Sequence, residues 1–299
     1  MLATPERCAL AVWAEMPAAL RRPRPSAWAR LNLADREIGC FLEGPAFDGA
    51  GNLYLVDIPF GRILRVDPQG SWSVAAEYDG WPNGLKVMPT GELLVADHKH
   101  GLLRVEPSSG RCRAMLTEAG GRPFIGLNDL FCAPGGDIYL TDQGQSGLHD
   151  PSGRVIRVGL DGRVATVLDA CPSPNGLVLD AERGWLLVAM TRANAVWRVP
   201  LVDGRPTKVG LAIQLSGGIG PDGLALDGNG CLLAVHAPIG LWQFDRDNLP
   251  RRFFAAPEGA PGGAYVTNLA LRRTAQGPRA FVTDAIAGRI LVADLPDDS

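Results

Sequence analysis

The stretch "IGPDGLALDGNG" runs from Ile219 to Gly230, and a close variant, "SPNGLVLDAERG", runs from Ser173 to Gly184. Each places a Pro, then an Asp or Asn, then Gly-Leu, directly before an apolar run typical of a strand. Taken alone, the pattern predicts a turn, because Pro fixes φ, Asn and Asp tolerate left-handed geometry, and Gly adopts positive φ freely. A single turn does not explain a repeat, so further copies are expected.

Six copies of the pattern recur at intervals of 40 to 47 residues, the length of one four-stranded propeller blade. Their key positions form what we term the inner ring: Glu43, Asn83, Asn128, Asn175, Asp222 and Asn268. A second strand follows in each copy, and its last residues form the second ring: Asp57, Asp97, Asp142, Met190, His236 and Asp284. We therefore predict an all-β fold, a six-bladed β-propeller with four-stranded blades.

The two ends of the chain complete this prediction. The sixth copy has room for only three strands, since the chain ends five residues after Asp294. The stretch "DREIGCFL" before Glu43 has no blade of its own, so we expect this N-terminal strand to pair with the last blade and close the ring. Residues 1–30 are predicted to form an N-terminal arm with an extended "RRPRP" segment, and residues 31–299 a single propeller domain.

Composition narrows the classes of partner. The 29 Lys and Arg against 32 Asp and Glu give a net charge of -3, which offers no basic field for nucleic acid or an anionic membrane. The six cysteines lack CxxC spacing and are predicted to be reduced core residues. The first 25 residues lack the basic start of a signal peptide, and Glu15 interrupts their apolar stretch. We expect a cytoplasmic monomer or small homo-oligomer.

The inner ring suggests a metal site. The first and second strands of a blade are antiparallel, so we expect both rings to lie at one end of the channel. Every inner-ring side chain carries an oxygen, and Glu43 is a poor turn former. Converging carboxylates and amides suit Ca²⁺, whereas Zn²⁺ is less well served because only His236 lies on either ring. We predict one divalent cation, Ca²⁺ ahead of Zn²⁺, Mn²⁺ or Mg²⁺; turn chemistry alone is the competing explanation.

Four motifs in order, "EGP", "GLND", "PNGL" and "PDGL", resemble the senescence marker protein/gluconolactonase family of calcium-dependent six-bladed propellers, to which bacterial lactonases and diisopropylfluorophosphatase are related. The resemblance covers about residues 43–295. It implies Asp222 as catalytic base or nucleophile, and metal ligands at Glu43, Asn128, Asn175 and Asp222. Sugar-lactonase members carry an Arg two positions before the third-blade Asn, where this chain has Gly126, so an aldonolactone is not the expected substrate.

Further site residues are expected around this centre. His236 is predicted to be catalytic, shuttling a proton or holding the leaving oxygen, although a structural hydrogen bond explains a lone His as well. Substrate contacts are predicted for Asn83, His98, Asn128 and Met190. Side chains that could form the channel mouth are Phe60, Trp81, Phe124, Ile125, His100 and His149. Ordinary blade packing, or solvation for the loop histidines, is the alternative for each.

The predicted function is metal-dependent hydrolysis of a small-molecule lactone or ester. The metal would polarise the carbonyl, and Asp222 would deprotonate the attacking water or attack directly. Three alternatives remain open. They are phosphotriester or phosphofluoridate hydrolysis at the same site, a non-catalytic calcium-binding propeller, and a metal-free carbon–carbon forming propeller as in strictosidine-synthase relatives. The set of Glu43, Asn175 and Asp222 argues against the last of these.

Overall fold

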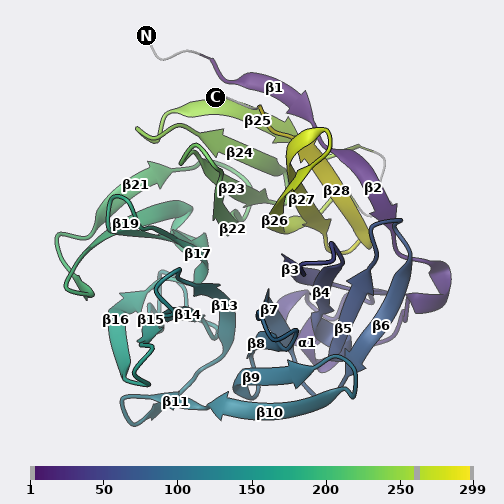
Figure 1. The fold of residues 1–299 in the computed structure, drawn as a ribbon, viewed down its shortest axis with the longest axis horizontal. Coiled ribbons are helices and arrows are strands. Elements are labelled where there is room, and N and C mark those ends of the chain that lie inside the picture. Colours follow the sequence, from purple (N-terminus) through teal and green to yellow (C-terminus); the bar gives the residue numbers. More distant parts are fainter. Residues whose placement is uncertain (1–3, 259–262, 297–299) are drawn as a thin grey trace.

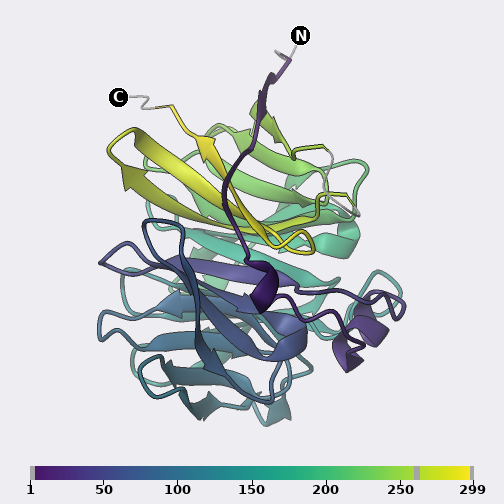
Figure 2. The ribbon, with the colours of Figure 1, turned by 90° about the vertical axis from the view of Figure 1, so that its right-hand side faces the viewer.

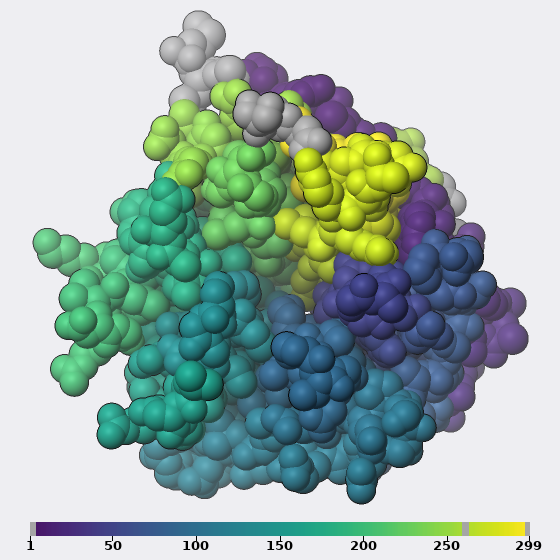
Figure 3. Space-filling model, viewed as in Figure 1, coloured from purple at the N-terminus to yellow at the C-terminus, as the bar shows by residue number. Residues whose placement is uncertain are grey.

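The structure, a computed structural model, describes residues 4–258 and 263–296. These residues form six blades of β-sheet that follow one another around a central axis in chain order (Figure 1). The space-filling view shows the same order as coloured sectors, with the last blade beside the first (Figure 3). The predicted all-β, six-bladed propeller is therefore confirmed. None of the helices among the described residues could span a membrane.

Each blade is an antiparallel sheet whose first strand lies nearest the axis. Blade one consists of β3 (Leu42–Phe47), β4 (Leu53–Asp57), β5 (Arg62–Val66) and β6 (Trp72–Glu77). Blade two consists of β7 (Pro82–Val87), β8 (Leu93–Asp97), β9 (Gly101–Glu106) and β10 (Arg111–Leu116). Blade three consists of β13 (Leu127–Cys132), β14 (Ile138–Asp142), β15 (Gly153–Val158) and β16 (Val164–Cys171).

The other three blades repeat this plan with additions. Blade four consists of β17 (Pro174–Asp180), β18 (Trp185–Met190), β19 (Ala195–Val202) and β21 (Gly210–Gln214). Blade five consists of β22 (Gly220–Leu226), β23 (Leu232–Ala237), β24 (Gly240–Phe244) and β25 (Pro250–Ala255), with β1 (Glu6–Ala9) parallel to β25. Blade six consists of β26 (Val266–Thr274), β27 (Gly277–Asp284), β28 (Arg289–Asp294) and β2 (Ala11–Glu15). Two short pairings are β11 (Glu118–Ala119) with β12 (Arg122–Pro123), and β20 (Arg205–Pro206) with β19.

The apolar runs of the second strands are explained by packing on both faces of a blade. In β8, Leu93 and Val95 join the apolar cluster shared with blade one, whereas Leu94 and Ala96 join the cluster shared with blade three. Successive residues of a strand point to opposite faces, so a strand buried on both sides reads as continuously apolar. Truncating one such leucine to alanine costs about 2–5 kcal/mol.

The outer strand of blade six comes from the N-terminal segment, but not from the residues predicted. β2 pairs antiparallel with β28, because Trp13 packs edge-on against Phe281 at 5.1 Å between ring centroids and Ala14 is buried. The "DREIGCFL" stretch contributes only an isolated bridge between Arg24 and Ile38 before β3 begins at its end. Residues 6–15, expected in an arm, thus belong to blades five and six. The domain boundary predicted at residue 30 does not separate them from the propeller.

The segment after β2 crosses to one face of the propeller (Figure 2). It contains the short helices η1 (Ala18–Leu20) and α1 (Ala27–Asn32), and η2 (Ile58–Phe60) follows β4. Ser26 caps α1 by accepting a hydrogen bond from the Ala29 N–H at 3.1 Å. Trp28 is buried against Phe41, with 4.5 Å between ring centroids. This contact fixes α1 beside the start of blade one.

All six inner strands are irregular at the inner ring. The pairing register of each first strand with its second strand shifts at that point, by bulges beside Glu43, Asn83, Asn128, Asn175, Asp222 and Asn268. A β-bulge leaves a residue unpaired and re-aims its side chain. The turn predicted for "PNG" and "PDG" is therefore wrong, because Asn175 and Asp222 lie inside β17 and β22.

The glycines of these motifs serve close approach of neighbouring strands. Neither Gly176 nor Gly223 has positive φ. A Cβ on Gly176 would lie 2.3 Å from the carbonyl oxygen of Asp222, and one on Gly223 would lie 2.3 Å from Oδ1 of Asn268. At these two positions only a residue without Cβ lets neighbouring inner strands approach this closely.

Candidate active site

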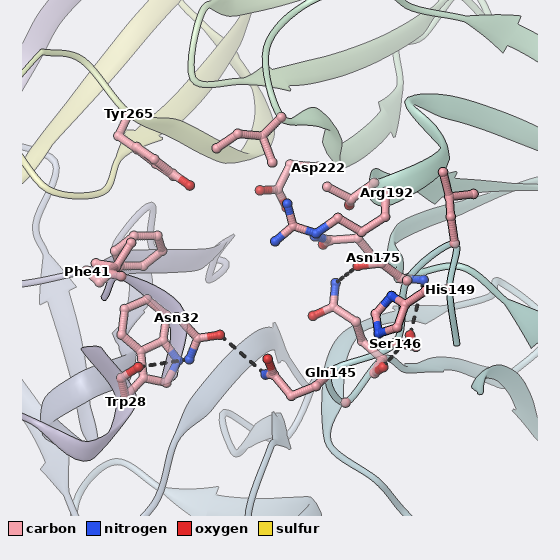
Figure 4. Close-up of a pocket in the computed structure, with 18 residues that line it drawn as sticks. Trp28, Asn32, Phe41, Gln145, Ser146, His149, Asn175, Arg192, Asp222 and Tyr265 are labelled. Atoms are coloured by element: carbon pink, nitrogen blue, oxygen red, sulfur yellow. Dashed lines mark hydrogen bonds between the residues drawn. The ribbon is translucent and has the colours of Figure 1, made fainter. Parts of the chain in front are cut away.

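The bulges bring the inner ring together around one small cavity. Glu43, Asn83, Asn128, Asn175 and Asp222 all line a space of about 100 Å³. A larger cavity of about 650 Å³ shares Asn175 and Asp222 with it and is also lined by α1 (Figure 4). The four residues predicted as metal ligands are each less than a tenth exposed. The structure therefore gathers them into one buried site.

Glu43 is fixed by hydrogen bonds, but its surroundings disfavour the charged form of its carboxyl group. Its Oε2 accepts hydrogen bonds from the Gly44 N–H at 2.8 Å and from Nδ2 of Asn268 at 2.9 Å. The same Asn268 amide lies 3.3 Å from Oδ2 of Asp129, so it bridges two carboxylates. Burial and then the charge of Asp129 raise the pKa of Glu43 to about 7, against the effect of its hydrogen bonds.

Asp222 has a buried oxygen without a partner. Its Oδ1 accepts no hydrogen bond within the part of the chain that the structure describes. Burial and the charges of Glu43 and Asp129 raise the pKa of Asp222 well above its ordinary value, whereas Asn175 and Arg192 oppose this rise. An unsatisfied buried carboxylate oxygen is costly, and a cation removes both that cost and the repulsion between the acids.

The amides complete a donor set that suits a hard cation. Nδ2 of Asn128 donates to Oε1 of Gln143 at 2.9 Å, and Nε2 of Gln143 donates to Oγ of Ser173 at 3.0 Å. These hydrogen bonds fix the Asn128 amide through its nitrogen, so its oxygen can serve as an acceptor. Carboxylate and amide oxygens match Ca²⁺. Among the described residues no group of three or more His, Cys, Asp and Glu could hold a metal, so a cation here depends on the amide oxygens.

The second ring does not face the channel as predicted. Asp57 is fully buried, accepts hydrogen bonds from the Phe41 N–H at 2.8 Å and Nε of Arg62 at 2.9 Å, and forms an ion pair with Arg62. The same arrangement of aspartate, backbone N–H and arginine recurs in blades three and six, at Asp142 with Arg154 and at Asp284 with Arg289. These aspartates tie the segment that enters each blade to its second strand, which is a structural role.

His236 and Met190 are not brought to the cavities that contain Asp222. The His236 imidazole is buried, with Nε2 at 2.9 Å from the Gly217 carbonyl and Nδ1 accepting from Nε1 of Trp242 at 3.3 Å. Both ring nitrogens are thus occupied, and the geometry does not support a proton shuttle. Met190 has no exposed surface and packs in the apolar core of blades three and four, so a substrate contact is not supported either.

His98 does reach the inner cavity. It also lines a separate cavity of about 450 Å³ beside Phe124, so its imidazole forms a wall between the two. A Cβ on Gly126 would lie 2.3 Å from Cε1 of His98, which leaves no room for an arginine at position 126. Burial lowers the pKa of His98, against the charge of Asp97. A neutral imidazole at physiological pH follows.

The outer cavity is lined largely by residues that the sequence did not reveal. They are Trp28 and Asn32 on α1, Phe41, Arg192, Tyr265 and the segment 143–149, of which only His149 was a candidate. Nε2 of Gln145 donates to Oδ1 of Asn32 at 3.4 Å, joining that segment to α1 (Figure 4). Of the predicted aromatic and aliphatic mouth residues, none lines this cavity within the described ranges. The serine that caps "AWARL" is a local signal for the helix α1. The neighbouring sequence does not indicate that this helix lines the cavity.

Comparison with known proteins places the chain among lactonase-like sequences. Residues 41–258 match the family model of the SMP-30/gluconolactonase/LRE-like region. The Arabidopsis thaliana protein strictosidine synthase-like 10 is 32% identical over 234 residues, covering 67% of this chain and 62% of that protein. The gluconolactonase of Zymomonas mobilis is 29% identical over 238 residues, covering 69% of this chain and 67% of the relative. The chain thus spans no more than about two thirds of the length of these relatives.

Solved structures share the whole fold. A gluconolactonase from Xanthomonas campestris has a TM-score of 0.75 at 22% identity and covers 95% of this chain and 98% of its own. The calcium-binding protein regucalcin from Agrobacterium tumefaciens has a TM-score of 0.72 at 20% identity, covering 97% and 95%. At these identities the likeness establishes the propeller fold.

Proposed function

Because the chain belongs to the SMP-30/gluconolactonase/LRE-like family, we propose that it is a hydrolase that opens the ring of a small-molecule lactone with one divalent cation. The relatives named gluconolactonase and lactonase support this substrate class. The observation in this chain that carries the proposal is the buried Asp222, whose Oδ1 has no partner among the described residues and which lines the same small cavity as Glu43.

Glu43, Asn128, Asn175 and Asp222 would hold the cation. Their oxygens favour Ca²⁺, and Mn²⁺ or Mg²⁺ fit the same donors better than Zn²⁺, since no His or Cys is among them. When bound, the cation supplies polarisation of the lactone carbonyl and compensates negative charge that develops on its oxygen. The two carboxylates among the four ligands balance its charge.

Asp222 would carry the proton transfer or the attack. In one route its carboxylate accepts a proton from the water that attacks the carbonyl carbon and opens the ring. In the other route the carboxylate attacks the carbonyl carbon itself, the ring C–O bond breaks and its oxygen takes up a proton, and water then hydrolyses the resulting anhydride to release the hydroxy acid. Tyr265 lines the same cavity, and burial raises the pKa of its hydroxyl to about 12, so it stays protonated and can donate a hydrogen bond to substrate. His98 and Asn83, which also line the inner cavity, would contact the substrate.

The alternative functions differ in whether they use the cavity that contains Glu43 and Asp222. Phosphotriester hydrolysis would use the same residues and differs in substrate. The carbon–carbon forming alternative regains interest from the name of the Arabidopsis relative, but it gives no role to Glu43, Asn175 and Asp222 in one cavity. A non-catalytic propeller would bind the cation without turnover.

The test is turnover on a panel of lactones and one phosphotriester, before and after chelation and after Ca²⁺ is restored. We expect lactone hydrolysis that is lost on chelation, and a decrease of about 100-fold or more in kcat/KM for Asp222→Asn. Glu43→Gln should weaken cation binding. Asp203→Asn is a matched control, because Asp203 is exposed on the β19–β20 hairpin at a φ of 51° that Asn tolerates. Full activity in the chelated enzyme or in Asp222→Asn would refute the mechanism.

A further inference from the structure

One permanent positive charge lines the outer cavity. Arg192 lies on η3 (Thr191–Ala193), directly after β18, and its guanidinium lies beside Asp222 (Figure 4). Oγ1 of Thr191 donates to the Pro221 carbonyl at 2.8 Å, which fastens η3 to the strand that carries Asp222. The position of Arg192 is therefore set by the same bulged strand that presents the catalytic carboxylate.

The Arg192 guanidinium is not used to hold the fold together in the described part of the chain. Within the described ranges it forms neither an ion pair nor a side-chain hydrogen bond, and the residue is exposed. The arginines at the ends of the third strands behave differently, since Arg62, Arg154 and Arg289 are each paired with a second-ring aspartate. Arg192 lies near enough to Asp222 and Tyr265 to oppose the rise in the pKa of each. Its charge thus acts on the cavity.

In the part of the chain that the structure describes, the surrounding wall offers hydrogen bonds but no second permanently charged cationic side chain. Gln145, Ser146 and Asn175 line the same cavity. A Cβ on Gly147 would lie 3.2 Å from Nδ1 of His149 and 3.9 Å from Cγ of Arg192, so these two side chains flank one point of the wall. Among the described residues that line the cavity, Asp222 is the only carboxylate, and a bound cation would neutralise it. One positive charge then remains unmatched in the cavity.

We propose that Arg192 binds a carboxylate substituent of the substrate, so that the preferred lactones carry a carboxylate beside the ring. The planar guanidinium fork matches a carboxylate with two parallel hydrogen bonds. A phosphate monoester carries more charge than one guanidinium balances, which favours the carboxylate. This inference rests on the proposed function for the substrate's ring, but the anion subsite itself can be tested without turnover.

The kinetic test compares two substrates that differ only in charge. 5-Oxotetrahydrofuran-2-carboxylate and 5-oxotetrahydrofuran-2-carboxamide share the same γ-lactone ring. Arg192→Gln should raise KM for the carboxylate about 10-fold or more and change KM for the carboxamide about 2-fold or less. Arg192→Lys, which keeps the charge, should recover part of the loss. Arg163→Gln removes a charge from the exposed β15–β16 turn and should change neither KM.

The binding test uses tetrahydrofuran-2-carboxylate, which has the ring and the anion but no lactone carbonyl. Calorimetry on the full chain should show binding that weakens about 10-fold in Arg192→Gln and persists in Arg163→Gln. Equal effects of Arg192→Gln on both lactones would overturn the proposal. So would binding that survives Arg192→Gln but disappears on chelation, because the cation would then hold the carboxylate. Absence of turnover on every lactone would refute the proposed function and leave the calorimetry to decide on Arg192.

Discussion

At the scale of single residues, the buried carboxylates of the site repel one another. Glu43 and Asp222 are buried in one cavity, with Asp129 close by. Burial and the charge of Asp129 raise the pKa of Glu43, and burial and the charges of Glu43 and Asp129 raise the pKa of Asp222. Such an arrangement opposes folding of the metal-free chain and favours any ligand that supplies positive charge. The same residues therefore set both the affinity for a cation and the stability of the protein without it.

This repulsion predicts how stability depends on pH. The pKa of Glu43 rises from 4.5 to about 7 on folding, so the folded chain keeps a proton that the unfolded chain releases over that interval. Its contribution to metal-free stability is full below about pH 4.5 and is lost as pH rises through about 7, by up to ~3 kcal/mol. The shift of Asp222 has the same sign. The Tm gained on adding Ca²⁺ should accordingly be larger at about pH 8 than at about pH 5.

The measurement is thermal unfolding with chelator and with Ca²⁺ across this range. Glu43→Gln is the matched variant, because it keeps the shape of the side chain and removes the charge. It should raise the Tm of the metal-free protein near pH 8 and reduce the gain from Ca²⁺. A Ca²⁺-induced gain that is independent of pH, in the original chain and in Glu43→Gln alike, would contradict the account.

Tyr265 supplies a second prediction at this scale. Its hydroxyl makes no hydrogen bond within the described residues, and its pKa of about 12 keeps it a donor at neutral pH. Tyr265→Phe should lower kcat/KM about 10-fold and leave Tm nearly unchanged, because only a bond to the substrate is lost. Tyr54→Phe, in a groove away from the axis, is the control. Unchanged kinetics for Tyr265→Phe would remove the residue from the site.

At the scale of elements, the bulged inner strand is the unit that makes the site. A regular strand would alternate its side chains between the two faces of a blade, whereas the bulge turns the inner-ring residue toward the axis. In blades one, two, four and five a glycine follows and admits the neighbouring strand; these glycines are Gly44, Gly84, Gly176 and Gly223. A short motif in the sequence thus determines both the bulge and the direction of the side chain that lines the site.

Gly176 tests this linkage. In Gly176→Ala the added Cβ would meet the Asp222 carbonyl oxygen at 2.3 Å, so β17 and β22 must separate. We expect a loss of about 2 kcal/mol or more in the free energy of unfolding, and a fall in Ca²⁺ affinity, because Asp222 moves with its backbone. Gly228→Ala is the matched control, since a Cβ there meets nothing within 4 Å. Chemical unfolding with and without Ca²⁺ gives both quantities, and equal behaviour of the two variants would refute the role of close approach.

The inner ring and most strands could be predicted because they depend on short repeated motifs. Glu43, Asn128, Asn175 and Asp222 occupy corresponding places in their blades, so the repeat alone brings them together. The roles of His236 and Met190 could not be predicted, because both depend on tertiary packing. His236 bonds to Gly217 and Trp242, and Met190 packs in the core between two blades. The residues that line the outer cavity could not be predicted for the same reason. It depends on α1 and the segment 143–149, which are far apart in the chain and meet only in the folded molecule.

At the scale of the whole molecule, β2 pairs with β28 as the outer strand of blade six, and this pairing predicts the result of shortening the chain. Deleting residues 1–15 removes β2 and exposes the edge of β28, so we expect a Tm lower by several degrees and association that grows with concentration. Deleting residues 1–9 removes β1, an additional strand on the complete sheet of blade five, but keeps β2, and should lower Tm much less. Thermal unfolding and light scattering compare the two truncations. If both behave alike, the pairing of β2 contributes no more to the ring than that of β1, and blade six must be stable with three strands.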